Sequence, residues 1–227
     1  MPGILEVIVT TVEEAREAEA GGADRLELVR ALCSGGLTPD LCLVRDVVRT
    51  VSVPVRVMVR ETASMTIRDG AEMEALRNQA SEIARLPVDG LVAGFVRRGE
   101  IDEDAMRQLL EPVPRLGVTF HRAFDEVENP LRAIEQLKGI RQVDHILTAG
   151  GQGEWPHRKV RLREWQQAAS PEIAIIVAAG LCPSILEDLN GEPQSFQFHV
   201  GRAARAGHSI SSAVDRRQVA SLKSLIR

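Results

Sequence analysis

The sequence predicts an α/β protein, a single (β/α)8 barrel of the TIM type that spans residues 1–227. Short apolar, β-branched runs alternate with amphipathic segments eight times, and strict alternation of this kind implies parallel strands joined by helices. Several of the runs are apolar on both faces, as buried parallel strands are. A length of 227 residues also suits one compact barrel of this class.

The eight strands are expected where the apolar runs occur. In chain order these runs cover residues 4–9, 25–29, 53–59, 90–94, 118–120, 143–147, 173–178 and 196–200. Most are four to seven residues long, which is typical of barrel strands and too short for buried helices. Their even distribution leaves no segment over for a second domain.

A helix is expected after each strand, and several helices carry a recognisable first residue or cap. These residues, which are polar caps or prolines suited to a first helical turn, are Thr11, Thr38, Asp102, Asn129 and Pro183. Glu14 follows Thr11 at the spacing of a capping box. The remaining helices are expected over 71–86, 159–168 and 213–226.

An open, doubly wound sheet is the main alternative architecture. Such a sheet usually has a glycine-rich turn after its first strand, whereas the corresponding segment here, VTTVEE, contains no glycine. The closed barrel is therefore the preferred prediction.

The composition argues against several classes of partner. Hydrophobic residues make up 44% and charged residues 26%, as in a globular protein. A formal net charge of −4 and the absence of a long basic tract argue against nucleic-acid or membrane-surface binding. Three widely spaced cysteines suit a reducing compartment better than a disulfide framework. With neither a signal-peptide pattern nor an apolar membrane-length stretch, we expect a cytoplasmic protein.

Two glutamates stand inside otherwise apolar strands. Glu6 lies in the first strand and Glu27 in the second, where burial is costly unless the carboxylates have partners. They could hold a divalent metal, or raise one carboxyl pKa for acid/base catalysis. His199 in the eighth strand could add a metal-binding nitrogen. Alternatively, the glutamates pair with Arg25, Arg56 or a histidine as structural ion pairs, and His199 is a hydrogen-bonded core residue.

Three polar residues gather at the end of the fifth strand. His121 and Arg122 end that strand in the segment VTFHRAFD, and Asp125 follows on the loop. The carboxyl ends of barrel strands are where the sites of this fold are built. Histidine exchanges protons near neutral pH, and arginine can clamp a carboxylate or phosphate. We therefore expect His121, Arg122 and Asp125 to share a catalytic pocket with Glu6 and Glu27.

Other residues after the strands could bind an anionic substrate. Glycines there let backbone N–H groups approach a phosphate, although glycines also simply make tight turns. The expected substrate-binding residues are Arg60, Thr148, Gly150, Gly180, Gly201 and Arg202. Arg60 has the alternative of being an ordinary surface arginine. The remaining histidines, His145, His157 and His208, have no supporting polar neighbours in the sequence.

Several segments follow the pattern and order of a known family over nearly the whole chain: LEV, GADRLEL, GGLTP, DGLVAG, VTFHRAFD, HILTAGG and a late FH. On these segments the chain resembles the CutC family, which is named for copper homeostasis. The resemblance implies a (β/α)8 barrel, a cytoplasmic location and self-association, which we expect to produce a dimer. It also implies copper, or another divalent metal, as a partner.

The family's cysteines are not at their usual positions in this chain. Some members carry cysteines after the first-strand glutamate and after the second strand, where this chain has Ile8, Val9 and Val29. Cys33 lies nearby but is displaced. Copper(I) prefers thiolate ligands, so the resemblance does not extend to a thiol site at those positions. The polar residues do match the family pattern: Glu6, Arg25, Glu27, His121, Arg122, Asp125 and His199.

Three functions are compatible with these patterns. The first is copper handling, which the resemblance implies. The second is a barrel enzyme in which His121 is the acid/base group and Arg122 with Arg202 binds a small anionic or phosphorylated substrate. The third is a non-enzymatic scaffold, which would need an exposed apolar patch. The length of the match favours copper handling, whereas the residue chemistry taken alone favours the enzyme.

Overall fold

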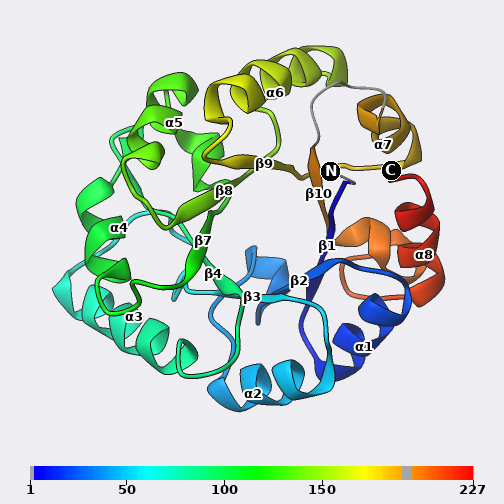
Figure 1. The fold of residues 1–227 in the computed structure, drawn as a ribbon, viewed down its shortest axis with the longest axis horizontal. Helices are drawn as coiled ribbons and strands as arrows, with labels where there is room; N and C mark the ends of the chain where they lie inside the picture. The colour runs from blue at the N-terminus through cyan, green and yellow to red at the C-terminus, as the bar shows by residue number, and fades with distance from the viewer. Residues whose placement is uncertain (1–2, 191–195, 227) are drawn as a thin grey trace.

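Eight parallel strands form a closed barrel in the order β1-β10-β9-β8-β7-β4-β3-β2 (Figure 1). The structure is a computed structural model that describes residues 3–190 and 196–226. The barrel strands are β1 Leu5–Val9, β2 Arg25–Leu28, β3 Val55–Met58, β4 Gly90–Ala93, β7 Gly117–Phe120, β8 Val143–Thr148, β9 Ala174–Val177 and β10 Gln197–Val200. The predicted (β/α)8 barrel is thereby confirmed.

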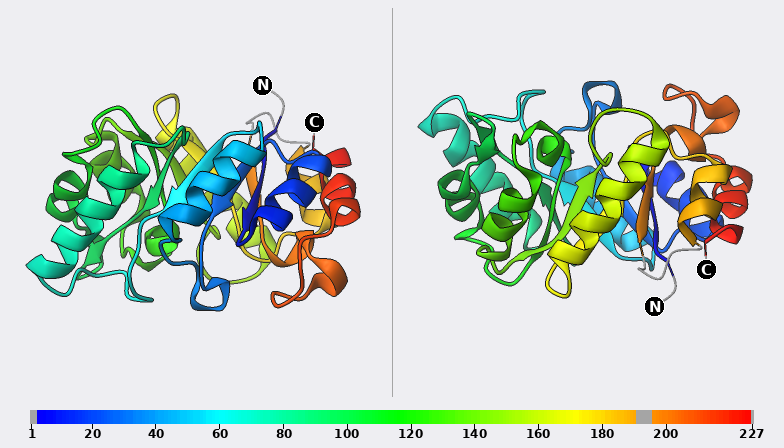
Figure 2. Two further views of the ribbon diagram at one scale, coloured as in Figure 1. Left: turned by 90° about the horizontal axis from the view of Figure 1, so that it is seen from below. Right: turned by 90° about the horizontal axis from the view of Figure 1, so that it is seen from above.

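The α-helices cover the outside of the barrel (Figures 1 and 2). They are α1 Val12–Ala20, α2 Leu41–Thr50, α3 Gly70–Ile83, α4 Glu103–Leu110, α5 Pro130–Lys138, α6 Trp155–Ala169, α7 Pro183–Asn190 and α8 Arg216–Ser224. Within the described ranges, no helix combines the length and the apolar character that crossing a bilayer requires.

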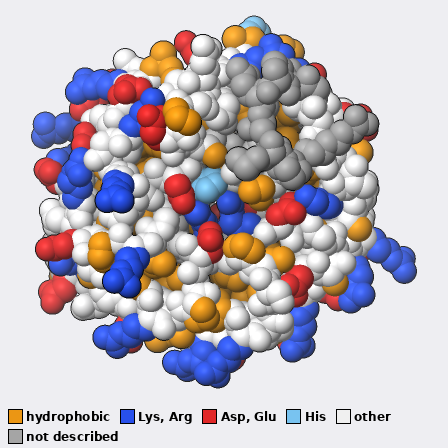
Figure 3. All heavy atoms as spheres, viewed as in Figure 1, with side chains coloured by type: hydrophobic (Ala, Val, Ile, Leu, Met, Phe, Trp, Pro, Cys, Tyr) orange, Lys and Arg blue, Asp and Glu red, His pale blue; other side chains and the backbone are white. Residues whose placement is uncertain are grey.

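The two ends of the barrel differ because all eight strands run in the same direction. We call the end where the strands begin the amino end and the end where they finish the carboxyl end. Figures 1 and 3 view the amino end.

Several short elements beyond the carboxyl ends of the strands were not predicted. Strands β5 Val96–Arg97 and β6 Glu100–Ile101 form an antiparallel hairpin after β4. The 3-10 helices are η1 Leu32–Ser34, η2 Arg122–Glu126, η3 Arg202–Ala204 and η4 Ala206–His208. Elements of two to five residues are too short to show a hydrophobic period, so the sequence pattern could not reveal them.

Helix starts agree with the sequence where a polar residue directly precedes the helix. Thr11, Asp102 and Asn129 each accept a hydrogen bond from the backbone N–H three residues further on. The second half of the predicted capping box is different, because the Glu14 carboxylate accepts the N–H of Thr10, at 2.8 Å, rather than that of Thr11.

The prediction that Thr38 caps the second helix is wrong. Helix α2 begins at Leu41, with Asp40 as the preceding residue. Thr38 is buried; its N–H donates to the Arg60 carbonyl at 2.9 Å and its hydroxyl accepts the Arg60 N–H at 2.8 Å. Because Arg60 lies on the next strand–helix unit, a local capping pattern could not distinguish this role. Helix α6 also begins earlier than expected, at Trp155, and α8 later, at Arg216.

Successive strand residues alternate between two environments, as the pleat requires. Outward residues such as Leu5, Val7 and Leu26 belong to the large core between the barrel and its helices. Inward residues nearer the amino end include charged side chains. A separate cluster of inward residues lies two positions further along the same strands. It consists of Ile8, Val29, Met58 and Val92, and we call it the inner apolar layer.

Two glycines make room for a buried arginine inside the barrel. Gly90 on β4 pairs with Gly117 on β7, and a Cβ on Gly90 would lie 2.5 Å from the Gly117 carbonyl oxygen. The side chain of Arg56 passes beside both residues, 3.4 Å from the Gly90 Cβ position and 3.2 Å from that of Gly117. Both glycines are therefore needed for space inside the barrel.

Replacing Gly90 with Ala is expected to destabilise the protein by about 1–3 kcal/mol, because the new methyl group meets backbone that cannot move aside. Gly70 at the start of α3 is the matched control, since nothing lies within 4 Å of its Cβ position. Gly70→Ala is expected to be neutral or to stabilise by up to about 1 kcal/mol. Urea denaturation measures both variants, and an equal effect at the two sites would contradict this account.

Candidate functional site

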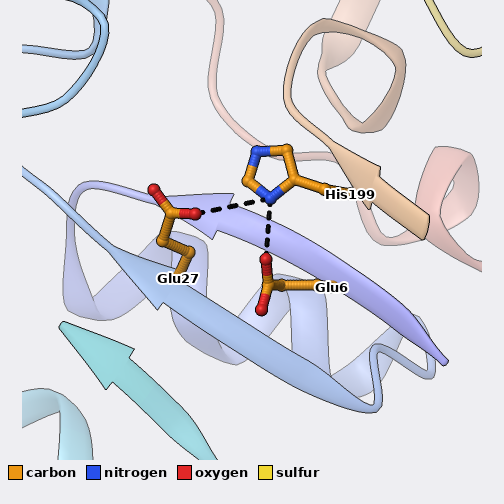
Figure 4. A group of neighbouring side chains, drawn as sticks. All are labelled: Glu6, Glu27 and His199. Carbon is orange, nitrogen blue, oxygen red and sulfur yellow. Dashed lines mark hydrogen bonds and ion pairs between the residues drawn. The ribbon is translucent and has the colours of Figure 1, made fainter. Parts of the chain in front are cut away.

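The side chains of Glu6, Glu27 and His199 converge inside the barrel from three neighbouring strands (Figure 4). The Nδ1 atom of His199 lies 2.8 Å from Oε1 of Glu6 and 3.5 Å from Oε2 of Glu27. One ligand atom from each residue falls within 4.8 Å of the other two. Register explains the meeting, because Glu6 pairs with His199 across β1 and β10, while Glu27 pairs with Ile8 across β2 and β1. We call these three residues the carboxylate–histidine group.

The protonation of this group is set by burial and by the charges around it. Burial opposes ionisation of Glu6, but the Arg25 charge and the His199 contact hold the pKa of Glu6 well below its ordinary value. Burial and the nearby charge of Glu6 raise the pKa of Glu27 to about 7, against the opposing influence of His199 and Arg25. The pKa of His199 is raised despite burial, because both carboxylates favour the imidazolium.

Glu27 has one oxygen that is not hydrogen-bonded. Its Oε2 atom is buried and has no hydrogen-bond partner in the described part of the chain. The Nδ1 atom of His199 lies 3.5 Å from this oxygen, at ion-pair distance. A buried acceptor without a hydrogen bond is destabilising, so this oxygen faces a position that a proton or a cation would satisfy.

Arg25 supports the carboxylate–histidine group from the amino-end side. Its Nε donates to Oε2 of Glu6 at 2.5 Å, which leaves Oε1 of Glu6 facing His199. Its terminal nitrogens lie 3.2 Å from Nε2 of His145 and 2.8 Å from Oε1 of Gln197. Glu6 therefore forms the ion pair with Arg25 that the structural interpretation expected. It also belongs to the group with Glu27 and His199 that a metal site would need.

A second buried arginine continues this network to the surface at the amino end. Arg56 donates to Asp89 at 2.9 Å, to Thr119 at 2.9 Å and to both oxygens of Asp144, at 2.7 and 2.8 Å. Asp144 also accepts from Nδ1 of His145 at 2.7 Å. Figure 3 shows a histidine among acidic and basic side chains at the centre of this face. The polar interior is thus continuous with the amino end of the barrel.

The residues predicted at the end of the fifth strand form a different group at the carboxyl end. Arg122 Nε donates to Asp125 at 2.9 Å. Asp125 also accepts the Thr148 hydroxyl at 2.5 Å and the Ala149 N–H at 3.0 Å. These bonds commit Asp125 and Thr148 to holding the two loops together.

His121 is buried beside this group and stays neutral. Burial and the charges of Arg60 and Arg122 lower its pKa to about 3. Its Nδ1 accepts the N–H of Ala123 at 3.1 Å, so the proton of the neutral ring is on Nε2. A neutral imidazole with this pKa can donate a hydrogen bond, but it is a poor acid or base at neutral pH.

The other predicted substrate-binding residues have varied surroundings. Arg60 is buried, whereas Arg202 is exposed at the start of η3. A Cβ on Gly150 would lie 2.9 Å from Leu162, and one on Gly201 would lie 3.2 Å from Ile8, so both glycines are closely packed. Only Gly180 has open space at its Cβ position, with a φ of +75°. Substrate binding by these residues stays a prediction.

The expectation that His121, Arg122 and Asp125 share one pocket with Glu6 and Glu27 stays a prediction. Among the described residues, no recorded hydrogen bond or ion pair joins Glu6, Glu27 or His199 to His121 or Arg122. The inner apolar layer lies between them along the strands. The sequence pattern could not show this, because both groups face inward but at different heights.

Sequence reasoning also missed part of the polar interior. His145 was expected to have no supporting neighbours, yet it contacts both Asp144 and Arg25. Asp144 and Asp89 were not considered at all. The signal that could have found Asp144 is its place at the start of a strand otherwise rich in apolar residues, beside a histidine.

These features define a closed (β/α)8 barrel with an interior carboxylate–histidine group. The model of the CutC family matches residues 3–200. A CutC family protein of Xanthomonas axonopodis pv. citri is 33% identical over 196 residues, covering 86% of this chain and 81% of the relative. The human protein named copper homeostasis protein cutC homolog is 31% identical over 197 residues, covering 86% and 72%. The chain belongs to the CutC family.

The fold agrees with that of a solved family member. The crystal structure of CutC from Streptococcus agalactiae superimposes with a TM-score of 0.80 at 22% identity, covering 88% of this chain and 98% of that one. Phosphoribosylanthranilate isomerase from Thermotoga maritima, at 13% identity, covers 98% and 97% with a TM-score of 0.63. At these identities the likeness concerns the fold alone.

Replacing Glu27 with Gln is expected to stabilise the protein above neutral pH. The protonated Glu27 carboxyl contributes folding stability that is fully present below pH 4.5, its ordinary pKa. This contribution is lost as the pH rises through about 7, the pKa in the folded protein. The gap between these values corresponds to at most roughly 3.5 kcal/mol. Urea denaturation of wild type and variant at pH 5 and pH 9 should show an advantage of the variant that grows with pH. If the advantage of the variant is the same at both pH values, the pKa of Glu27 in the folded protein is close to its ordinary value and the account is wrong.

Proposed function

We propose that this chain binds copper in its divalent state at Glu6, Glu27 and His199, and that it acts in copper homeostasis through this site. Family membership supports the role, since relatives such as the human protein carry copper homeostasis in their names. The observation that carries the site is the buried, unbonded Oε2 of Glu27, which faces the nitrogen of His199.

The donor set fits a divalent transition-metal ion. Two carboxylates and one imidazole supply oxygen and nitrogen ligands, which suit copper(II) and other divalent ions. The available atoms are Oε1 of Glu6, Oε2 of Glu27 and Nδ1 of His199. Arg25 holds the other Glu6 oxygen and so orients this carboxylate, while its positive charge weakens the attraction for a cation.

The positions of the three cysteines argue against copper(I) bound at a thiolate site inside the barrel. Cys33 and Cys42 are exposed and Cys182 is half-buried. Ile8 and Val29 belong to the inner apolar layer. The barrel interior therefore has no thiolate at these two positions, and Met58 supplies one thioether in the same layer.

Metal binding at this group must be coupled to proton release. Glu27, whose pKa is raised to about 7, keeps its proton below neutral pH, and the raised pKa of His199 also favours its protonated form. A metal ion requires the carboxylate and the neutral imidazole. Affinity should therefore rise with pH between pH 6 and pH 8, the interval in which Glu27 loses its proton.

The cellular setting is part of the proposal. The three cysteines are free, which supports a reducing, cytoplasmic compartment. Dimer formation stays a prediction.

Calorimetric titration of the metal-free protein with copper(II) tests the site. Wild type is expected to bind one ion tightly, and Glu27→Gln and His199→Gln are each expected to bind it at least tenfold more weakly, a loss of about 1.4 kcal/mol or more. Electron paramagnetic resonance should show a nitrogen ligand that is lost in His199→Gln. Wild-type affinity in both variants would contradict the proposal.

Two control variants separate this site from other copper ligands. Glu135→Gln removes a carboxylate that is exposed and paired with Lys138, so it should leave binding unchanged. The triple substitution Cys33→Ser, Cys42→Ser and Cys182→Ser should also leave copper(II) affinity unchanged. A large loss in the triple variant would favour thiol coordination.

A further inference from the structure

Arg60 is a buried cation at the carboxyl end of β3 that has no carboxylate partner. The residue is 6% exposed, and among the described residues no carboxylate lies within 4.0 Å of its guanidinium. One terminal nitrogen donates to the Gly35 carbonyl at 3.4 Å and the other to the Ala63 carbonyl at 2.5 Å. Its Nε atom is buried and has no hydrogen-bond partner in the described part of the chain.

This arrangement is unfavourable for the protein alone. A buried charge is normally paired, because two carbonyl contacts do not replace the hydration that the guanidinium loses. Burial lowers the pKa of Arg60, and the exposed Glu126 offsets this only partly. Thr38 nevertheless fixes the Arg60 backbone with hydrogen bonds in both directions. The cation is thus held in place without a counter-ion.

His121 presents a second donor near Arg60. Its ring packs against Gly94, where a Cβ would lie 2.7 Å from Nδ1, so the absence of a side chain there makes room for the imidazole. Because Nδ1 accepts the Ala123 N–H, the ring must carry its proton on Nε2. No described residue accepts a hydrogen bond from this Nε2–H. The charge of Arg60 is near enough to help keep the ring neutral.

Arg122 adds positive charge at the rim. It is half-exposed, and only its Nε is engaged, by Asp125. The carboxylate of Asp125 is shared with the Thr148 hydroxyl and the Ala149 N–H. In residues 3–190 and 196–226, only Nε of Arg122 has a hydrogen-bond partner, which leaves its terminal nitrogens available.

We propose that the carboxyl end of the barrel binds a small oxyanion between the guanidinium of Arg60 and the Nε2–H of His121, with Arg122 at the rim. The ligand class is a phosphate or carboxylate group on a small molecule. Such a group accepts charge-assisted hydrogen bonds from arginine and a further bond from a neutral imidazole. It would supply the acceptor that the Arg60 Nε lacks.

This site differs from the one that the glycine pattern suggested. The Gly201 position is filled by the side chain of Ile8, and Thr148 is bonded to Asp125. The donors instead follow β3 and β7. The site also lies on the other side of the inner apolar layer from the carboxylate–histidine group, so it does not depend on copper binding.

Titration of the metal-free, chelator-treated protein with inorganic phosphate, and separately with succinate, tests the site. The His121 Nε2 resonance in nitrogen-15 NMR is expected to shift saturably with at least one of the two anions. Arg60→Gln should weaken that binding by at least tenfold, since it removes a charge-assisted hydrogen bond. The control Arg68→Gln removes an exposed arginine paired with Asp69 and should leave binding unchanged.

Circular dichroism checks that Arg60→Gln is folded. If it is not, Arg122→Gln is the second variant, because this residue is half-exposed at the rim. It is expected to weaken binding several-fold, as loss of a rim charge does. If the His121 Nε2 resonance of the wild-type protein fails to saturate with either anion, the proposal is overturned, whatever the variants show. Unchanged affinity in a folded Arg60→Gln would overturn it too. Which anion saturates identifies the ligand as phosphate-like or carboxylate-like.

Discussion

Two buried arginines organise the interior of this barrel. Arg25 joins β2 to partners on β1, β8 and β10, and Arg56 joins β3 to partners on β7 and β8 and to Asp89 ahead of β4. Removing one partner of such a pair leaves an uncompensated buried charge, which typically destabilises by several kcal/mol. These contacts therefore tie the registers of strands that are distant in sequence. They also set the position of Glu6, on which the carboxylate–histidine group depends.

The network divides the chemistry of the barrel along its axis. The acidic and imidazole groups lie inside the barrel in contact with the amino-end network, and the unpaired arginine lies at the carboxyl end. The inner apolar layer separates them, and a low-polarity layer keeps charges on either side from neutralising one another through direct contact. The two proposed sites thus lie on opposite sides of this layer. Family members are named for copper homeostasis, and the metal site proposed for this chain would offer oxygen and nitrogen ligands.

The strands could be predicted well because each is a short apolar run, and the closed barrel followed from their strict alternation with helices. The helix starts at Thr11, Asp102 and Asn129 were also predictable, because a cap acts on residues three positions away. Thr38 was misassigned for the opposite reason, since its partner Arg60 is 22 residues distant. Hairpin β5–β6 and the 3-10 helices carry too few residues for any period to appear.

For the site, the sequence by itself showed which polar residues stand within apolar strands, namely Glu6, Glu27, His121 and His199. It could not determine which of them meet. Two inward-facing residues meet only if strand register and barrel tilt bring them to one height. Tertiary structure decided that Glu6, Glu27 and His199 converge. It also decided that the His121 ring packs against Gly94, and that Arg25 takes one oxygen of Glu6. The physical reason is that a local pattern specifies the face on which a side chain lies, whereas pairing between strands far apart in the chain specifies its neighbours.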